Sequence, residues 1–309
     1  SPWTMSACAS AIIHWGAIPI FADIESTTFN IDPESIKKNI TEKTKAIMAI
    51  DIFGHSCDID KINSIAKKNN LKVITDSAQA PWSSNKNRIT GTLADIGGFS
   101  LNYHKHIHTG EGGIIVTNND NLADRMKLIR NHAESVAEKY GVKNFNNLVG
   151  YNFRLGEIEC AIGIEQIKKL DKIVEYKRSC AEKLTKELTN LKGLITPKVL
   201  KNNTHSYYIY PMLLDKSIIN VPREVIADAL ENEGMQGLMR GYVNLHLLPI
   251  FQQKIAYGSR GFPWTYVDSR ENINYSKGIC PVAELLQDEL FLGFEICLFH
   301  LNDKDIKKI

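Results

Sequence analysis

The sequence predicts an α/β protein built on a mostly parallel sheet, for two reasons. Short, almost continuously apolar runs alternate with segments of helical periodicity through the first half of the chain. Strands of that kind are buried on both faces and joined by helices, which is the pattern of a parallel sheet. The second half lacks this alternation and predicts a smaller α+β unit.

The expected elements follow from apolar spacing and from the residues that end each run. Asp32 and Pro33 predict a helix start, because Asp caps a helix and Pro suits its first turn. Apolar residues three and four apart predict a helix over 58–70. Strands are expected at 18–22, 45–53, 71–75, 95–101, 113–117 and 206–214, and the other helices at 121–130, 154–190 and 221–234.

Length suggests two domains. The 309 residues are expected to form a large domain over 1–190 and a small one over 191–309. The first residue is Ser1, not an initiator Met, and the chain ends within an expected helix, so we expect each domain to be incomplete at its outer end.

Charge and composition exclude several classes of protein. Lys and Arg number 37 against 35 Asp and Glu, and a net charge of +2 gives no sign of nucleic-acid binding. No apolar run is long enough to cross a bilayer. The six cysteines include no CxxC pair and are expected to be reduced, buried thiols of a cytoplasmic protein.

Two polar residues lie where a parallel sheet presents its ligand, just beyond apolar strands. Asp76 follows the strand at 71–75, and its carboxylate can hold a cationic nitrogen or cap a helix. Lys105 lies between two expected strands. It is a candidate for an amine of lowered pKa that forms a Schiff base, although most lysines are simply solvated. The glycines of 110–113 indicate a tight turn or a close approach to a ligand.

One economical interpretation joins these features. Pyridoxal 5′-phosphate (PLP) needs a lysine for its aldehyde, an acid for its pyridine nitrogen and donors for its phosphate. Lys105, Asp76 and Ser100 could supply one of each.

A metal site is the competing chemistry. His104, His106 and His108 alternate, so on an extended strand they would share one face. No carboxylate or cysteine nearby completes the set, and the glycines that follow favour a loop. We therefore expect no metal.

Several motifs occur in a distinctive order along the chain. They are Asp76-Ser77-Ala78-Gln79-Ala80, Gly98-Phe99-Ser100, Lys105, Gly110-Glu111-Gly112-Gly113, Arg130-Asn131-His132 and Gly150-Tyr151-Asn152-Phe153-Arg154. This order resembles the DegT/StrS family of PLP-dependent nucleotide-sugar aminotransferases. The resemblance runs from about residue 4 to the C-terminus and implies the aspartate-aminotransferase fold, PLP fold type I.

The resemblance also implies the role of each residue in the site. Lys105 would form the Schiff base with PLP and then move the proton between cofactor and substrate. Asp76 would pair with the pyridine nitrogen and Gln79 with the phenolic oxygen. Ala78 would pack on the ring, and Ser100 would donate to the phosphate.

The implied partners are glutamate, as amino donor, and a nucleotide-linked keto-sugar, for amino-sugar or surface-polysaccharide synthesis. Asn152 would reach the phosphate of the neighbouring subunit's cofactor, which implies a homodimer with shared active sites. Aromatic and basic residues suit such a substrate; the candidates are Tyr207, Tyr208, His246, Arg260, Phe262 and Trp264. Alternation along a half-buried strand explains Tyr207 and Tyr208 equally well.

The sequence departs from the family in three ways. Family members carry an earlier segment that opens a helix onto the phosphate, Met5 stands where many have an aromatic residue, and Asn244 replaces a common proline. The family's sugar dehydratases, which replace the lysine with histidine, are the close competitor, because His104 and His106 flank Lys105. A non-catalytic binding protein of the same fold and a metal-dependent hydrolase built on the three histidines are two further hypotheses.

Overall fold

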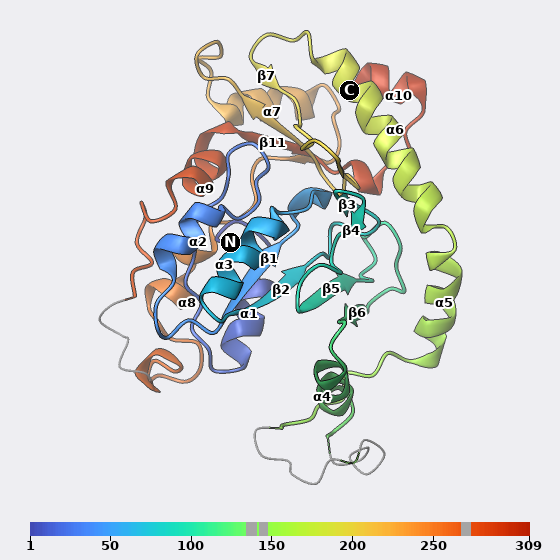
Figure 1. The fold of residues 1–309 in the computed structure, drawn as a ribbon. Helices are drawn as coiled ribbons and strands as arrows, with labels where there is room; N and C mark the ends of the chain where they lie inside the picture. The colour runs from blue at the N-terminus through green and yellow to red at the C-terminus, as the bar shows by residue number, and fades with distance from the viewer. Residues whose placement is uncertain (134–140, 142–147, 267–272) are drawn as a thin grey trace.

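The computed structural model describes residues 1–133, 141, 148–266 and 273–309, and a four-stranded sheet lies at its centre (Figure 1). The strand order is β1-β2-β5-β6; β1, β2 and β5 are parallel, and β6 is antiparallel to β5. The predicted mostly parallel sheet is confirmed. The strands are β1 (Ala46–Ile50), β2 (Lys72–Asp76), β5 (Ile96–Ser100) and β6 (Gly113–Val116).

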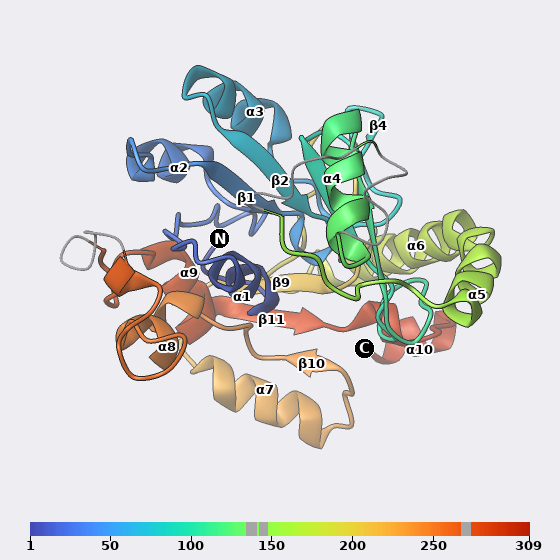
Figure 2. The same cartoon turned by 90° about the horizontal axis from the view of Figure 1, so that it is seen from below.

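Helices cover both faces of this sheet, as its apolar strands require. Ile47 and Ala49 of β1 belong to a buried cluster with α2 and α3, whereas Ile50 belongs to a second cluster with α1. This alternation follows from the two-residue period of a strand. Figure 2 shows α1 on the opposite side of β1 from α2 and α3. The helices are α1 (Ala7–His14), α2 (Pro33–Asn39) and α3 (Ile59–Lys68).

Side-chain caps explain where the early helices begin. Asp32 accepts hydrogen bonds from the backbone N–H groups of Glu34 and Ser35, at 2.9 and 3.2 Å, so the predicted start of α2 is confirmed. Asp58 caps α3 by accepting from the N–H of Lys61 at 3.3 Å. The helices predicted at 121–130 and 221–234 are also present, as α4 (Asp120–Arg130) and α7 (Arg223–Asn232).

The strand predicted at 18–22 is wrong. Residues 17–23 pair with no strand, and an isolated bridge between Ile24 and Ile31 follows them. The apolar side chains are buried by packing instead: the ring of Phe21 lies edge-on to Phe251, with centroids 5.1 Å apart. A short apolar run indicates burial, and burial does not require a strand partner.

The single helix predicted over 154–190 is two helices, α5 (Glu157–Ile167) and α6 (Leu170–Leu188). α6 buries Val174, Ala181 and Leu184, whereas α5 buries no residue. The helix is interrupted at residues 168–169, and only the second part packs its apolar residues into a core. Apolar spacing shows that a stripe exists but not which way it faces.

A second sheet forms the predicted α+β unit. Its order is β10-β11-β9-β7, antiparallel throughout. Residues of α6, α7 and α10 share one buried cluster with it, so α6 packs here although it precedes residue 190. The division at 190 stays a prediction. The elements are β7 (Leu194–Ile195), β9 (Tyr210–Leu214), β10 (Leu238–Met239), β11 (Phe291–Phe294) and α10 (Asp303–Lys308).

The strand predicted at 206–214 starts later, at Tyr210, because the first half of the chain holds the preceding residues. The N–H of Ser206 donates to the Gly54 carbonyl and the N–H of Tyr208 to the Phe53 carbonyl, both at 2.9 Å. Gly54 has a φ of +106°, and a Cβ there would lie 2.5 Å from the Ser206 Oγ. Only glycine permits this close approach.

Further contacts tie the two halves together. A small sheet of order β4-β3-β8 pairs β3 (Ser84–Asn85) with β8 (Asn203–Thr204), and β4 spans Arg88–Ile89. The Trp3 ring lies edge-on to Phe53 and Phe291, with centroids 5.6 and 4.8 Å apart. One core therefore includes residues from both ends of the chain.

All six cysteines are free thiols, and four of them are buried. Within the described ranges, no helix has the length and apolar character needed to cross a membrane. The two remaining short α-helices are α8 (Pro249–Gln252) and α9 (Pro281–Leu285).

Asp23 connects the start of the chain to α9. Its two carboxylate oxygens accept hydrogen bonds from the N–H groups of Val282 and Ala283, at 2.9 and 3.0 Å. The residue is buried, at 9% exposure. The first N–H groups of a helix have no acceptor inside the helix. Asp23 supplies that acceptor from a distant part of the sequence.

We expect Asp23→Ala to lower the free energy of unfolding by about 1–3 kcal/mol, because buried N–H groups lose their acceptor. Asp23→Asn keeps a carbonyl oxygen and should lose less. Urea unfolding followed by circular dichroism measures both. Asp228→Ala, at a side chain that is 60% exposed, is the control. Equal stability of Asp23→Ala and the control would contradict the role of Asp23.

Candidate active site

Lys105 lies in the loop that joins β5 to β6. Backbone hydrogen bonds close the base of this loop, from Leu101 to Gly112 and from Thr109 to Leu101, at 2.9 and 3.0 Å. The Lys105 Nζ lies 4.2 Å from the centre of the Tyr208 ring, and the aromatic face favours a cation there. A short loop thus holds the lysine against the second half of the chain.

The surroundings of Lys105 make it a better nucleophile than an exposed lysine. Burial lowers the pKa of its amine, and the nearby carboxylate of Asp76 partly opposes this shift. Lowering the pKa increases the neutral fraction of the amine, which is the form that attacks a carbonyl.

Asp76 ends β2, at the carboxyl edge of the parallel sheet. Its Oδ1 accepts a hydrogen bond from the N–H of Ala78 at 3.0 Å, and its Oδ2 accepts one from the thiol of Cys8 at 2.9 Å. Residues 77–83 form turns and no helix, so the carboxylate does not cap a helix. The helix-cap interpretation is therefore wrong, and the binding of a cationic nitrogen by Asp76 stays a prediction.

Gln79 is fixed between the two halves of the chain. Its Oε1 accepts a hydrogen bond from the N–H of Phe53 at 2.7 Å, and its Nε2 donates to the Tyr242 hydroxyl at 3.3 Å. Burial raises the pKa of Tyr242, so this hydroxyl keeps its proton and can donate in turn. The amide is held firmly enough to present polar atoms in a constant direction.

The remaining predicted cofactor residues lie at the edges of this group. Ser100 ends β5, and its Oγ accepts from the N–H of Asn102 at 3.1 Å, which leaves the hydroxyl proton to donate. Ala78 is half-buried beside Asp76. Asn152 is exposed and forms an isolated bridge with Asn131.

The histidines that flank Lys105 also lie near Tyr208, with the ring centroids of His104 and His106 at 6.1 and 6.3 Å from that of the tyrosine. His106 is buried and its Nε2 lies 2.8 Å from the Ser206 carbonyl, to which it donates; burial lowers the pKa of His106 to about 4. His104 packs edge-on to Tyr103, with ring centroids 4.9 Å apart. The charge of Asp76 raises the pKa of Lys105, whereas the charge that raises the pKa of His104 is that of Glu111. The Asp76 carboxylate therefore lies within electrostatic range of the lysine.

The alternating histidines form no common face, because residues 101–112 form a loop and not a strand. His106 is buried whereas His108 is exposed. Among the described residues, no group of three or more His, Cys, Asp or Glu side chains is arranged to hold a metal ion.

Two of the predicted substrate residues lie inside the core. His246 is fully buried, with its Nε2 2.9 Å from the Glu284 Oε1, and Trp264 is fully buried, donating from Nε1 to the Tyr275 hydroxyl at 3.1 Å. Neither exposes surface to a ligand in this chain. Arg260 is exposed and Phe262 half-buried, and their contact with substrate stays a prediction.

The sequence does not predict the contacts of three residues in the site. Tyr208, predicted as a sugar-binding residue, lies under the Lys105 amine. Cys8, predicted to be only a buried thiol, contacts Asp76, and Tyr242 contacts Gln79. No spacing in the sequence indicates these contacts. Tyr207, the other tyrosine candidate, is buried with its ring stacked on His205.

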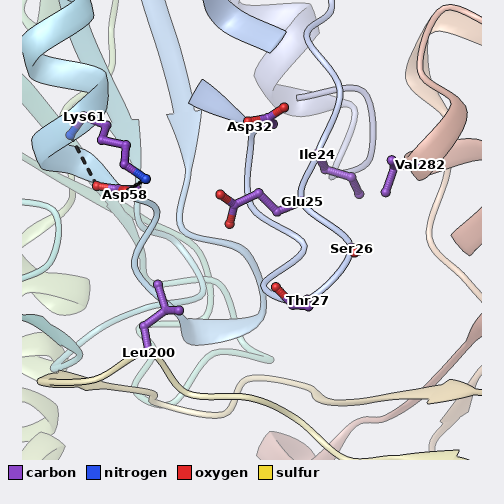
Figure 3. Close-up of a pocket in the computed structure, with 9 residues that line it drawn as sticks. All are labelled: Ile24, Glu25, Ser26, Thr27, Asp32, Asp58, Lys61, Leu200 and Val282. Carbon is purple, nitrogen blue, oxygen red and sulfur yellow. Dashed lines mark hydrogen bonds and ion pairs between the residues drawn. The ribbon is translucent and has the colours of Figure 1, made fainter. Parts of the chain in front are cut away.

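A hollow of about 570 Å³ lies apart from these residues, beside the starts of α2 and α3 (Figure 3). It presents the carboxylates of Glu25, Asp32 and Asp58, and its lysine, Lys61, is paired with Asp58 at 2.8 Å. An acidic lining does not suit a phosphate or a nucleotide diphosphate. The candidate active site is therefore defined by the contacts around Lys105 and not by this hollow.

Residues 1–275 match the DegT/DnrJ/EryC1/StrS aminotransferase family. The chain belongs to this family. It is 32% identical over 269 residues to the spore coat polysaccharide biosynthesis protein SpsC of Bacillus subtilis, covering 85% of this chain and 69% of that protein. It is 31% identical over 280 residues to a GDP-perosamine synthase of Vibrio cholerae, covering 90% and 74%.

Solved structures agree with this membership. An aminotransferase from Psychrobacter cryohalolentis superposes with a TM-score of 0.83 at 27% identity, covering 99% of this chain and 77% of that one. PseC of Helicobacter pylori, an aminotransferase involved in pseudoaminic acid biosynthesis, gives 0.77 at 26%, covering 99% and 76%. The aspartate-aminotransferase-like fold and the class of PLP-dependent sugar aminotransferase, both predicted from the sequence, are confirmed.

The donor set of this DegT/StrS-family chain fits PLP. Lys105 offers an amine of lowered pKa, Asp76 a carboxylate, Gln79 a buried amide and Ser100 a hydroxyl with a free proton. These are the groups that an aldehyde, a pyridine nitrogen, a phenolic oxygen and a phosphate require. Met5 is 57% exposed, and its sulfur can pack against a ring.

We expect the pKa of Lys105, measured without PLP, to lie below the ordinary 10.5 and to fall further in Asp76→Asn. Removing a negative charge beside an ammonium group destabilises its charged form, so the sign of the shift is downward. Competitive acetylation against pH, read by mass spectrometry, gives the midpoint. Asp58→Asn, which removes the partner of Lys61, should leave Lys105 unchanged. An unchanged or raised midpoint in Asp76→Asn would refute the coupling.

Proposed function

We propose that this enzyme transfers the amino group of glutamate to a nucleotide-linked keto-sugar, in amino-sugar or surface-polysaccharide synthesis. The observation that carries the proposal is the placement of the Lys105 amine, which lies 4.2 Å from the centre of the Tyr208 ring and is close enough to Asp76 for the carboxylate to raise its pKa. The named activities of relatives support the substrate class, since they include GDP-perosamine synthase and a UDP-amino-sugar transaminase of Helicobacter pylori.

Each residue of the site has a role that its contacts support. Bound PLP supplies an aldehyde that captures amino groups and a ring that withdraws electrons. Lys105 is the nucleophilic amine that holds this aldehyde, and later carries the proton to and from the substrate carbon. The face of Tyr208, 4.2 Å from its nitrogen, stabilises the amine when it is protonated.

The other side chains bind and orient. The negative charge of Asp76 stabilises the protonated form of the pyridine nitrogen, so the nitrogen keeps its proton. Gln79 directs its amide to the phenolic oxygen, and Ala78 packs on the ring. Ser100 donates to the phosphate. Arg260 and Phe262 remain the proposed contacts for the sugar nucleotide.

The dehydratase hypothesis is disfavoured by the presence of lysine at position 105. One similar structure is a GDP-4-keto-6-deoxymannose-3-dehydratase, with a TM-score of 0.78 and 25% identity, so this fold serves both activities. The family resemblance implies that its dehydratases replace the lysine with histidine. Here Lys105 is the residue whose pKa responds to Asp76, while His106 donates to a backbone carbonyl.

We further propose a homodimer in which Asn152 completes the partner's phosphate site. Asn152 is exposed in the single chain, and Phe153 beside it is 58% exposed. On α5, Ile158, Ile164 and Ile167 are 76%, 58% and 55% exposed, and the helix buries no residue. A helix with several exposed apolar side chains is a candidate for a protein interface. The six free thiols support a reducing, cytoplasmic location.

Borohydride reduction of the protein with PLP should attach a pyridoxyl group to Lys105, because reduction traps the bond between its amine and the aldehyde. The modified peptide is identified by mass spectrometry. Lys105→Arg keeps the positive charge but lacks a nucleophilic amine, so it should show no adduct and no detectable transamination. No adduct on the wild-type protein, or full activity of Lys105→Arg, would overturn the proposed function.

Mixing two inactive variants tests the shared site. Lys105→Ala damages the chain's own site, whereas Asn152→Ala damages the partner's. A mixed dimer therefore has one site with both defects and one intact site. Random exchange of subunits should restore about a quarter of the wild-type activity, since half the dimers are mixed. If Asn152→Ala loses no activity, or mixing restores none, the proposed role of Asn152 is wrong.

A further inference from the structure

The thiol of Cys8 is one of two groups that hold the Asp76 carboxylate. The distance from Cys8 Sγ to Asp76 Oδ2 is 2.9 Å, and the Ala78 N–H donates to the other oxygen, Oδ1, at 3.0 Å. One donor on each oxygen fixes both the rotation and the plane of the carboxylate. A carboxylate has about four lone-pair positions, so a third donor can still be accepted.

The chemistry of this thiol suits it to donate. Burial raises the pKa of Cys8, and the charge of Asp76 raises it further. The thiol therefore keeps its proton at neutral pH and does not act as a nucleophile. A thiol is a weak donor, but an ionised acceptor makes its hydrogen bond stronger than one to a neutral group.

The backbone that carries Cys8 is itself held in place. Cys8 is 6% exposed in the first turn of α1, and Ala9 and Ile13 of the same helix are buried in the core. The Thr4 Oγ1 also lies near the thiol, at the longer distance of 4.0 Å. The thiol is thus anchored by a packed helix and directed at the carboxylate.

We propose that Cys8 is a positioning residue, which aims the Asp76 carboxylate at the cationic nitrogen of the cofactor. Its role rests on the proposed function, in which Asp76 binds that nitrogen. Cys8 acts through Asp76 and touches neither the aldehyde nor the substrate. The consequence is that the thiol contributes to cofactor affinity in proportion to its ability to donate a hydrogen bond.

Two substitutions separate donation from packing. Ser and Ala are nearly equal in size, so Cys8→Ser and Cys8→Ala remove similar volume from the core, but only serine keeps a donor. We expect Cys8→Ala to weaken PLP binding about tenfold, the lower end of what a hydrogen bond to a charged group contributes. Cys8→Ser should bind PLP nearly as wild type does. Absorbance titration of PLP measures both affinities.

A control and a second background make the test specific. Cys180→Ala removes another buried thiol, packed in the cluster around β9, and should leave PLP affinity unchanged. In an Asp76→Ala background, Cys8→Ala and Cys8→Ser should bind PLP equally, because the group on which the thiol acts is gone. Thermal unfolding of each variant shows that the comparison is made on folded protein.

Two results would overturn the proposal while leaving the proposed function intact: equal loss of PLP affinity in Cys8→Ala and Cys8→Ser, or a difference between them that persists without Asp76. Failure of the wild-type protein to form a pyridoxyl adduct at Lys105 is a separate result. It would remove the proposed function, and the role of Cys8 with it.

Discussion

The site depends on the backbone contact between residues 53–54 and 206–208. Through it, the second half of the chain reaches the carboxyl edge of the parallel sheet, and Tyr208 comes to lie under Lys105. The same short segment gives the Phe53 N–H that fixes Gln79. A Cβ at Gly54 would collide with Ser206 and force the two backbone segments apart. The contact between the two halves of the chain therefore requires glycine at this position.

The sequence could predict those features that local patterns determine. Asp76 and Lys105 follow buried strands, and a parallel sheet brings the ends of its strands together, so their proximity is foreseeable. The predictions of a strand at 18–22 and a long helix at 154–190 fail because an apolar run indicates burial without indicating what covers it. Contacts between distant residues carry no local signal: Cys8 and Asp76 are 68 positions apart, and Gln79 and Tyr242 are 163.

Residue type is a poor guide to the substrate side of the site. Histidine and tryptophan suit a sugar nucleotide, but they also fill cores when their polar atoms find partners. His246 and Trp264 have such partners in Glu284 and Tyr275, and both are fully buried. Whether an aromatic residue packs or binds depends on the neighbours that folding provides, and a single sequence does not contain that information.

Lys105 owes its chemistry to groups from both halves of the chain. Burial lowers the pKa of its amine, and part of that burial is the ring of Tyr208, which the second half supplies. If the halves were to separate, water would reach the amine and its pKa would return toward the ordinary 10.5. The reactivity of the lysine therefore depends on the contact between the halves: burial in the closed chain increases the neutral, nucleophilic fraction of the amine, and separation would decrease it.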